Sequence, residues 1–368
     1  MDKYADLIAE GARSIFKTNL VTNSSTVEKF EKNLESYLGT HVAALSSCTA
    51  GLMLTAQLLG LREQEIIMPS FTFCATAISM SWCDCKFKFV DIDEKTFNLS
   101  PDKVSEAITP NTKAILATHI FGNVCDIKAL SDLAADHKMN LFFDSAHGLG
   151  GNYNGTKVGN FGNAEIFSCS PTKLLSTIEG GIVSSNDISL IKKMKVARNY
   201  GVLEDYNVVY QGLNARLGEV NAALGLMFME DLETYVKNRN NYAKIFINKL
   251  KNIEGVSFQK IGKGVLSTYK DFAVVIDPEV FGLSRDAFSE ALSKDGIPIK
   301  KYFYPPVHKT DLYKEYASAK LPITEKVASN IVCLPIYNIM GDEMIDSICD
   351  VVIKIKTYAG EIKKNAKK

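Results

Sequence analysis

The sequence predicts an α/β protein built on a mostly parallel sheet, followed by a smaller C-terminal α+β domain. Up to about residue 185, short apolar runs alternate with helix-like stretches, which is typical of strands joined by helical crossovers. Several of these runs are continuously apolar, as expected for strands that are covered on both faces. Beyond this point the alternation stops, and a long helical stretch without proline begins at residue 216.

Seven strands are expected in the first half of the chain. They are 42–45, 65–68, 87–91, 114–118, 140–143, 165–168 and 181–184, and the clearest helical patterns between them are 49–59, 100–107 and 127–137. The stretch 216–250 is expected to bridge two lobes as a long helix, with a bend near 238–241. A strand at 271–276 and helices at 284–295 and 342–358 predict the smaller domain. We therefore divide the chain into a large domain, 1–235, and a small domain, 236–368.

The composition excludes several classes of protein. Lys+Arg and Asp+Glu both number 42, and this balance argues against a protein that mainly binds nucleic acid or an anionic membrane surface. Hydrophobic residues make up 46% of the 368 residues, which is too many for a disordered chain. No apolar segment is long enough to span a bilayer, and no signal peptide is evident. The eight cysteines lack zinc-type spacing, so we expect no metal and reduced thiols in the cytoplasm.

Polar residues follow four of the expected strands, at the edge where open α/β sheets bind their ligands. After the first strand, Cys48 and Thr49 lead into a helix whose free N–H groups and hydroxyl would suit a phosphate. An ordinary helix cap would have the same sequence. After the fifth strand come Asp144 and His147. They suit a buried cation and a ligand, or equally a capping carboxylate and a histidine whose hydrogen bonds are satisfied.

Lys173 follows the sixth strand, and Phe73 follows the second. A lysine in a polar loop is usually solvated, but this one lies between two core strands and is expected to be partly buried. Burial lowers the pKa of an amine and makes it a nucleophile. Phe73 is either a core residue or a platform for a flat ring. Together with Asp144 and Thr49, these residues match the needs of pyridoxal 5'-phosphate (PLP): an amine, a carboxylate, a phosphate seat and an aromatic face.

The order of motifs along the chain carries a resemblance to a known family. The motifs are Ser47-Cys48-Thr49-Ala50, Pro69-x-x-Thr72-Phe73, His119-x-x-Gly122, Asp144-x-Ala146-His147, Ser168-x-x-x-x-Lys173, Glu179-Gly180-Gly181, Gly212-Leu213-Asn214-Ala215-Arg216 and Tyr304-Pro305-Pro306-Val307-His308. This order resembles the fold-type I, aspartate-aminotransferase-like enzymes, which use PLP. More narrowly, it is similar to the DegT/DnrJ/EryC1/StrS family, whose members aminate nucleotide-linked keto sugars. The similarity runs over most of the chain and implies a seven-stranded, mostly parallel sheet flanked by helices.

The resemblance also implies roles for individual residues. Lys173 would bind the cofactor aldehyde covalently and move the proton, and Asp144 would pair with the ring nitrogen. His147 would lie near the phenolic oxygen of the ring, and Phe73 would stack on the ring. The phosphate would contact Cys48, Thr49, Ser168 and, from the other subunit of a homodimer with shared active sites, Asn214. Tyr302, Tyr304 and His308 would lie toward the sugar-nucleotide entrance.

Three positions depart from the pattern of the family. Cys48 stands where glycine is usual, which slightly alters how the backbone approaches the phosphate. Cys169-Ser170 replaces the common Phe-His and changes the packing over the cofactor. Asn23-Ser24-Ser25 replaces the usual Gly-Pro in a region that often faces the substrate, so the sugar specificity is open.

The expected activity is a two-step transamination. L-glutamate, or glutamine, would donate an amino group that is then passed to a nucleotide-linked deoxysugar, with dTDP-4-keto-6-deoxyhexose as the first expected substrate. The product would serve surface polysaccharide (O-antigen) or natural-product glycan synthesis. A 3-keto sugar and GDP- or UDP-linked sugars are alternatives. Two further alternatives are a PLP-dependent sugar dehydratase, which would carry histidine in place of Lys173, and a non-catalytic protein with this fold.

Overall fold

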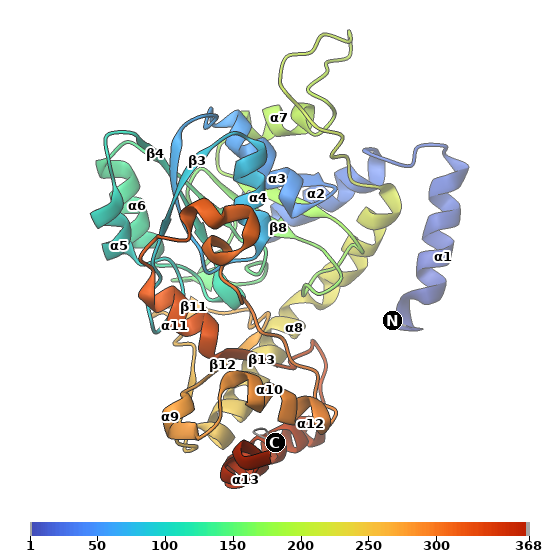
Figure 1. The fold of residues 1–368 in the computed structure, drawn as a ribbon. Coiled ribbons are helices and arrows are strands. Elements are labelled where there is room, and N and C mark those ends of the chain that lie inside the picture. The colour runs from blue at the N-terminus through green and yellow to red at the C-terminus, as the bar shows by residue number, and fades with distance from the viewer. Residues whose placement is uncertain (1, 366–368) are drawn as a thin grey trace.

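A computed structural model describes residues 2–365, so residue 1 and residues 366–368 of the two predicted domains lie outside the described residues. A seven-stranded sheet forms the large lobe (Figure 1), in the order β1-β9-β8-β5-β4-β2-β3. Strand β9 runs opposite to the other six strands of this sheet, so the predicted mostly parallel sheet is confirmed. The strands are β1 (His41–Leu45), β2 (Glu65–Pro69), β3 (Lys86–Val90), β4 (Thr112–Thr118), β5 (Asn140–Asp144), β8 (Ala164–Ser168) and β9 (Gly181–Ser185).

Helices cover both faces of this sheet. One face packs on α2 (Ser25–Leu38), α5 (Pro101–Ala107), α6 (Ile127–Asp136) and the first half of α8 (Glu219–Leu250). The other packs on α3 (Cys48–Leu58), α4 (Cys74–Trp82) and α7 (Ile188–Ala197). In β1, Val42 and Ala44 point to the first core and Ala43 and Leu45 to the second. This alternation explains why the strand is apolar throughout.

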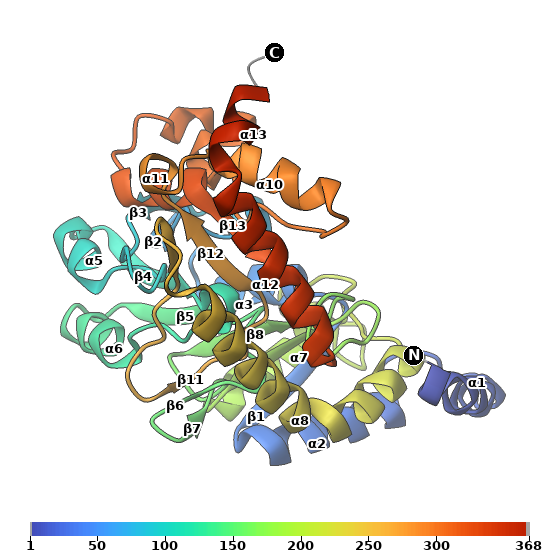
Figure 2. The same ribbon diagram turned by 90° about the horizontal axis from the view of Figure 1, so that it is seen from below.

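The small lobe is built around the second half of α8. This helix runs unbroken through 238–241, where we expected a bend, and joins the two lobes (Figure 2). The core of the lobe contains a three-stranded antiparallel sheet, β10 (Val256–Phe258), β12 (Phe272–Ile276) and β13 (Ile331–Leu334). Its helices are α9 (Pro278–Phe281), α10 (Arg285–Lys294), α11 (Pro322–Asn330), α12 (Asp342–Thr357) and α13 (Ala359–Asn365). The α+β composition predicted for this part is thus confirmed.

The remaining elements are short or peripheral. They are α1 (Asp2–Lys17), the second three-stranded sheet β6 (Asn152–Tyr153), β7 (Thr156–Lys157) and β11 (Val265–Leu266), and the 3-10 turns η1 (Ile120–Gly122), η2 (Val307–Lys309) and η3 (Asp311–Tyr316). Val307 and Tyr313 pack into the core of the large lobe, although they come late in the sequence. The division at residue 235 falls inside α8, and it stays a prediction. None of the helices within residues 2–365 is both long enough and apolar enough to cross a membrane.

The two lobes are tied together where β3 ends. Asp91 is buried, and its carboxylate accepts hydrogen bonds from the backbone N–H groups of Ile323 and Thr324 and from the Thr324 hydroxyl, at 2.7–3.0 Å. It therefore caps α11 of the small lobe from the large lobe, where the helix has free N–H groups and a positive end. Nearby, Glu94 forms an exposed ion pair with Lys326 of the same helix at 2.6 Å.

We predict that Asp91→Ala lowers the free energy of unfolding by about 2 kcal/mol, because buried N–H groups lose their acceptor. Glu94→Ala is the matched control and should change it by less than about 0.5 kcal/mol, since both ends of that ion pair are solvated. Chemical denaturation of the two variants measures the difference. Equal effects of the two substitutions would contradict the capping role of Asp91.

Candidate functional site

The carboxyl-terminal edge of the sheet brings together residues that are far apart in the sequence. Lys173 follows β8, Asp144 ends β5, and Cys48 begins α3 directly after β1. Electrostatic interactions connect Lys173 with Asp144, Cys48 and His147. Because β8 lies beside β5 and is separated from β1 by β9 alone, the sheet order itself places these three strand ends at one site.

The turn from β1 into α3 forms a seat of backbone groups. The Ser47 hydroxyl accepts a hydrogen bond from the Ala50 N–H at 3.1 Å and so caps the helix, whose positive end faces this edge. Gly181, the first residue of β9, lies against the turn: a Cβ there would be 2.3 Å from the Ser47 carbonyl carbon and 2.5 Å from the Cys48 nitrogen. Only glycine fits so close to this backbone.

Cys48 does not obstruct the seat with an exposed side chain. Its thiol is buried and lies 3.7 Å from the Ile166 carbonyl oxygen of β8. Burial, reinforced by the negative charge of Asp144, raises the pKa of the Cys48 thiol well above its usual value. The thiol is therefore neutral near pH 7. Thr49, which is partly exposed in the same helical turn, contributes a hydroxyl at this position.

Asp144 is a buried carboxylate held by two hydrogen bonds. Its Oδ2 accepts from the Thr76 hydroxyl at 2.6 Å, and its Oδ1 accepts from the Ala146 N–H at 3.1 Å. Burial raises the pKa of Asp144, although both hydrogen bonds and the charge of Lys173 oppose the rise. Among the described residues, no cation lies in salt-bridge contact with Asp144, so a positively charged group bound beside it would be stabilised.

Lys173 has the reactivity expected of a nucleophilic amine. Burial, followed by repulsion from Lys270, lowers the pKa of Lys173 to about 8. A substantial fraction of the amine is then neutral at physiological pH, whereas an ordinary lysine is almost fully protonated. The loop is turned by a hydrogen bond from the Lys173 N–H to the Ser170 carbonyl at 3.0 Å.

His147 is neutral and has a defined orientation. Burial and the charges of Lys173, Lys270 and Lys300 lower the pKa of His147 well below its usual value. Its Nδ1 accepts a hydrogen bond from the Phe121 N–H at 3.2 Å, which assigns the remaining proton to Nε2. The imidazole lies nearly parallel to the Phe121 ring, at 14° and a centroid distance of 6.3 Å. It can therefore donate one hydrogen bond to an oxygen of a ligand.

The three remaining residues that were predicted to contact the cofactor lie in environments that differ from one another. Phe73 is 56% exposed and its ring faces Phe303, with centroids 6.5 Å apart. The Ser168 hydroxyl, at the end of β8, donates to the Ser170 hydroxyl at 3.2 Å. Asn214 is exposed, at the base of an extension, 199–214, that projects from the large lobe near α7 (Figure 1).

The three residues expected near the sugar-nucleotide entrance do not share one environment. Tyr304 is exposed and lies over the guanidinium of Arg285, while Tyr302 stacks on its neighbour Phe303. His308 is fully buried: its Nδ1 lies 2.6 Å from the Ser70 hydroxyl, and its Nε2 lies 3.2 Å from Glu325. In this structure His308 connects the lobes. Because its side chain is buried, it could affect a substrate only indirectly, by positioning Ser70 and Glu325.

Several residues of the site were not singled out from the sequence. Thr76 orients Asp144, and a buried network lies behind it. Glu165, in β8, accepts hydrogen bonds from Ser145 and from two backbone N–H groups, and lies 3.3 Å from His119. An acidic residue inside an otherwise apolar strand is the signal that could have revealed Glu165, because a buried carboxylate requires donors. Lys270 and Asp271 carried no comparable signal.

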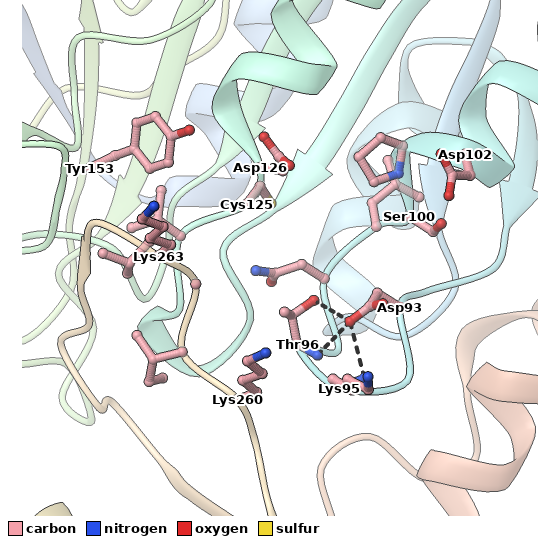
Figure 3. Close-up of a pocket in the computed structure, with 17 residues that line it drawn as sticks. Asp93, Lys95, Thr96, Ser100, Asp102, Cys125, Asp126, Tyr153, Lys260 and Lys263 are labelled. Carbon is pink, nitrogen blue, oxygen red and sulfur yellow. Dashed lines mark hydrogen bonds between the residues drawn. The ribbon is translucent and has the colours of Figure 1, made fainter.

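A concave region lies away from this site (Figure 3). It is a pocket of about 420 Å³ between the loop after β3, the start of α6 and the segment 260–265. Three lysines and three aspartates line it, and Asp93 accepts three hydrogen bonds within its own loop. None of the predicted site residues contributes to it. Among residues 2–365, moreover, no three His, Cys, Asp or Glu side chains gather as metal ligands would.

Comparisons with known proteins agree with the geometry. The model of the DegT/DnrJ/EryC1/StrS aminotransferase family matches residues 3–353. The chain is 31% identical to dTDP-4-amino-4,6-dideoxy-D-glucose transaminase of Shigella dysenteriae, over 93% of this chain and 94% of that protein. It is 28% identical to GDP-perosamine synthase of Vibrio cholerae, over 89% of each. The crystal structure of DesI with its TDP-sugar product superposes with a TM-score of 0.92 and 30% identity, over 98% of this chain and 92% of that one.

The lowered pKa of Lys173 predicts a pH profile. In the protein freed of cofactor, the rate at which Lys173 captures PLP should rise with pH and level off above about 8, because only the neutral amine attacks an aldehyde. For an ordinary lysine the rise would continue toward pH 10.5. The rate is followed by absorbance at a series of pH values, and the attachment point is located by reduction and peptide mass spectrometry, with Lys173→Ala as control. A rise that continues toward pH 10 would contradict the burial argument.

Proposed function

Because the chain belongs to the DegT/DnrJ/EryC1/StrS aminotransferase family, we propose that it transfers the amino group of L-glutamate to a nucleotide-linked deoxysugar, with dTDP-4-keto-6-deoxyhexose as the preferred acceptor. That it is a PLP-dependent sugar-nucleotide aminotransferase follows from the family itself. The donor, the sugar, the nucleotide and the residue roles are our proposals. The observation that carries the residue roles is a buried carboxylate, Asp144, that interacts electrostatically with a partly neutral amine, Lys173, at one edge of the sheet. The choice of sugar and nucleotide rests on the named relatives.

The residues present fit the cofactor. When bound, PLP supplies an electron-accepting ring that stabilises negative charge on the reacting carbon. Asp144, which has no cation in salt-bridge contact among the described residues, would hold the protonated ring nitrogen. His147 would donate a hydrogen bond from its Nε2–H to the phenolic oxygen of the ring. The turn capped by Ser47 would offer the phosphate the backbone N–H groups and the positive end of α3.

We assign the remaining contacts by position. Cys48, Thr49 and Ser168 would contact the phosphate, Cys48 through its backbone because its thiol is buried. Phe73 would lie against the face of the ring, since its exposed side chain begins α4 at the same edge. Lys173 would hold the aldehyde and, once the amino donor displaces it, carry the proton between the two reacting carbons, a role suited to an amine that titrates near neutrality.

Two considerations favour the dTDP-4-keto substrate. The relative from Shigella dysenteriae is named for a dTDP-linked 4-amino sugar, and DesI was crystallised with a TDP-sugar. Other relatives at 28–29% identity are named for GDP-perosamine, for a dTDP-linked 3-amino sugar and for a UDP-linked 3-amino sugar, so these are the second candidates. Tyr302 and Tyr304 would lie along the path of the nucleotide. A PLP-dependent sugar dehydratase would carry histidine in place of Lys173, so the lysine at this position argues against that activity. A non-catalytic role is disfavoured because the site residues are all present.

The decisive experiment incubates the protein, PLP and L-glutamate with dTDP- and GDP-linked 4-keto-6-deoxyhexoses and with dTDP- and UDP-linked 3-keto sugars. We expect the dTDP-4-keto sugar to gain an amine fastest by mass spectrometry, with glutamine slower than glutamate. Lys173→Ala should lose the absorption band of the bound cofactor and about 10²- to 10⁴-fold or more in turnover. Preference for another sugar would replace the proposed substrate. PLP binding without amination of any sugar would refute the proposed function.

We also propose that the protein acts as a homodimer in the cytoplasm, with each active site completed by Asn214 of the partner subunit. The extension 199–214 carries large exposed apolar residues, and Tyr206 and Val208 are 88% and 64% exposed. Phe16 of α1, which stands apart from the large lobe in Figure 1, is 63% exposed. Several large apolar residues exposed on one segment are typical of a surface that another subunit covers. All eight cysteines are free, which suits a reducing compartment.

Mixing two inactive variants tests the shared site. Lys173→Ala and Asn214→Ala are unfolded together and refolded, so that mixed dimers form. If Asn214 acts across the interface, a mixed dimer contains one intact site, and about a quarter of the wild-type activity should return. If Asn214 serves its own protomer, no activity above that of the separate variants returns. Light scattering of the wild type provides the mass, and a monomer would refute the dimer directly.

A further inference from the structure

Lys270 is a second buried lysine beside the reactive one. It comes just before β12, is 4% exposed, and its ammonium contacts both oxygens of Asp271 at 2.9 and 3.1 Å. Its backbone N–H donates to the Phe121 carbonyl at 2.9 Å, which fixes this small-lobe segment against the end of β4. Its charge acts on both Lys173 and His147. A buried ammonium at this position, outside the roles assigned above, is unusual because its desolvation is unfavourable.

The pocket that these two lysines share is positively charged. It has a volume of about 420 Å³ and lies between the loop of Lys173 and the small lobe. Lys173, Lys270, Lys300 and Arg239 line it, against a single carboxylate, Asp271. Such an excess of positive charge would attract an anion.

Arg239 lines the pocket, but its guanidinium also forms hydrogen bonds with the backbone of the small lobe. Its Nη1 donates to the carbonyls of Tyr269 and Lys270 at 2.8 and 3.0 Å, and its Nε donates to the Asn338 side chain at 2.8 Å. The guanidinium therefore positions the segment that carries Lys270. Lys300 is exposed on the wall of the pocket. Lys270 is thus the buried cation that lines this pocket and whose charge acts on Lys173.

We propose that Lys270 binds the α-carboxylate of the amino donor, an inference that rests on the proposed function. In an amino acid the carboxylate is attached to the same carbon that exchanges its amine, so its charge must lie beside Lys173. In a nucleotide-linked keto sugar the diphosphate is separated from the reacting carbon by the sugar ring, and its charge lies farther away. A cation within electrostatic reach of Lys173 therefore matches the donor and not the sugar nucleotide.

Asp271 sets the conditions under which Lys270 acts. In the absence of donor it keeps the buried ammonium paired and oriented, because an isolated buried charge would be strongly destabilising. When a donor carboxylate arrives, Lys270 lies between two carboxylates, and Asp271 weakens the binding by repulsion. The two residues consequently have opposite effects on donor affinity, which a purely structural ion pair would not have.

Three variants of the PLP-loaded enzyme test the proposal. In Lys270→Met, the glutamate concentration for half-maximal conversion of the cofactor, measured without sugar, should rise about ten- to hundredfold, the effect of losing a charge-assisted hydrogen bond. The dissociation constant of glutarate, a dicarboxylate without an amine, should rise equally in calorimetry. The reverse half-reaction with the amino sugar should change less than about threefold. Asp271→Asn should lower both donor constants, and Lys263→Met, at the exposed surface, should leave them unaltered.

The outcomes separate the two proposals. Wild-type donor constants in Lys270→Met, or equal losses toward donor and amino sugar, would overturn the carboxylate seat while the wild type still transaminates. Should Lys270→Met fold poorly, Lys270→Met/Asp271→Leu removes both buried charges, and it should still show the loss of glutarate binding. Retained glutarate binding in that double variant would also overturn the seat. A wild type that no amino acid converts would refute the proposed function, and the carboxylate seat with it.

Discussion

The removal of two titratable groups from water, Asp144 and Lys173, governs the chemistry of the whole site. Burial raises the pKa of the carboxyl and lowers that of the amine, so burial shifts each group toward its neutral form. Neither effect would arise on a solvated surface, where the two groups would be an ordinary anion and cation. A cofactor with a basic ring nitrogen and an aldehyde would relieve both effects: its protonated ring nitrogen would pair with Asp144, and its aldehyde would bind the neutral amine of Lys173.

The burial of Asp144 is tolerated because the surrounding backbone and side chains already provide hydrogen-bond donors to its carboxylate. Thr76 and the Ala146 N–H hold Asp144. Behind it, Glu165 receives hydrogen bonds from Ser145 and from the turn that includes Gly159. Every acceptor in this network is matched to a donor, which is the condition for a stable buried polar cluster. These hydrogen bonds hold the side chains on the sheet side of the site in place.

The small lobe supplies the other wall, and its position depends on a few directional contacts. Asp91 caps α11, His308 connects to Ser70, and the segment carrying Lys270 binds the Phe121 carbonyl. These contacts join the ends of β2, β3 and β4 to the small lobe. A movement of the small lobe would therefore shift Lys270 and change its electrostatic effect on the pKa of Lys173. That connection explains how a residue about 100 positions away in sequence lowers the pKa of the reactive amine.

The sequence by itself determined the sheet and the polar residues at its edge. All seven strands predicted from apolar runs are present, because a strand buried on both faces must be apolar throughout, and Lys173, Asp144 and Cys48 meet because parallel strands end at a common edge. Only the tertiary structure decided the rest. The burial of His308, the hydrogen bond from Thr76 and the approach of Lys270 join segments that are distant in sequence. Local patterns do not report such contacts, because they depend on how the lobes pack and on which charges lose their water.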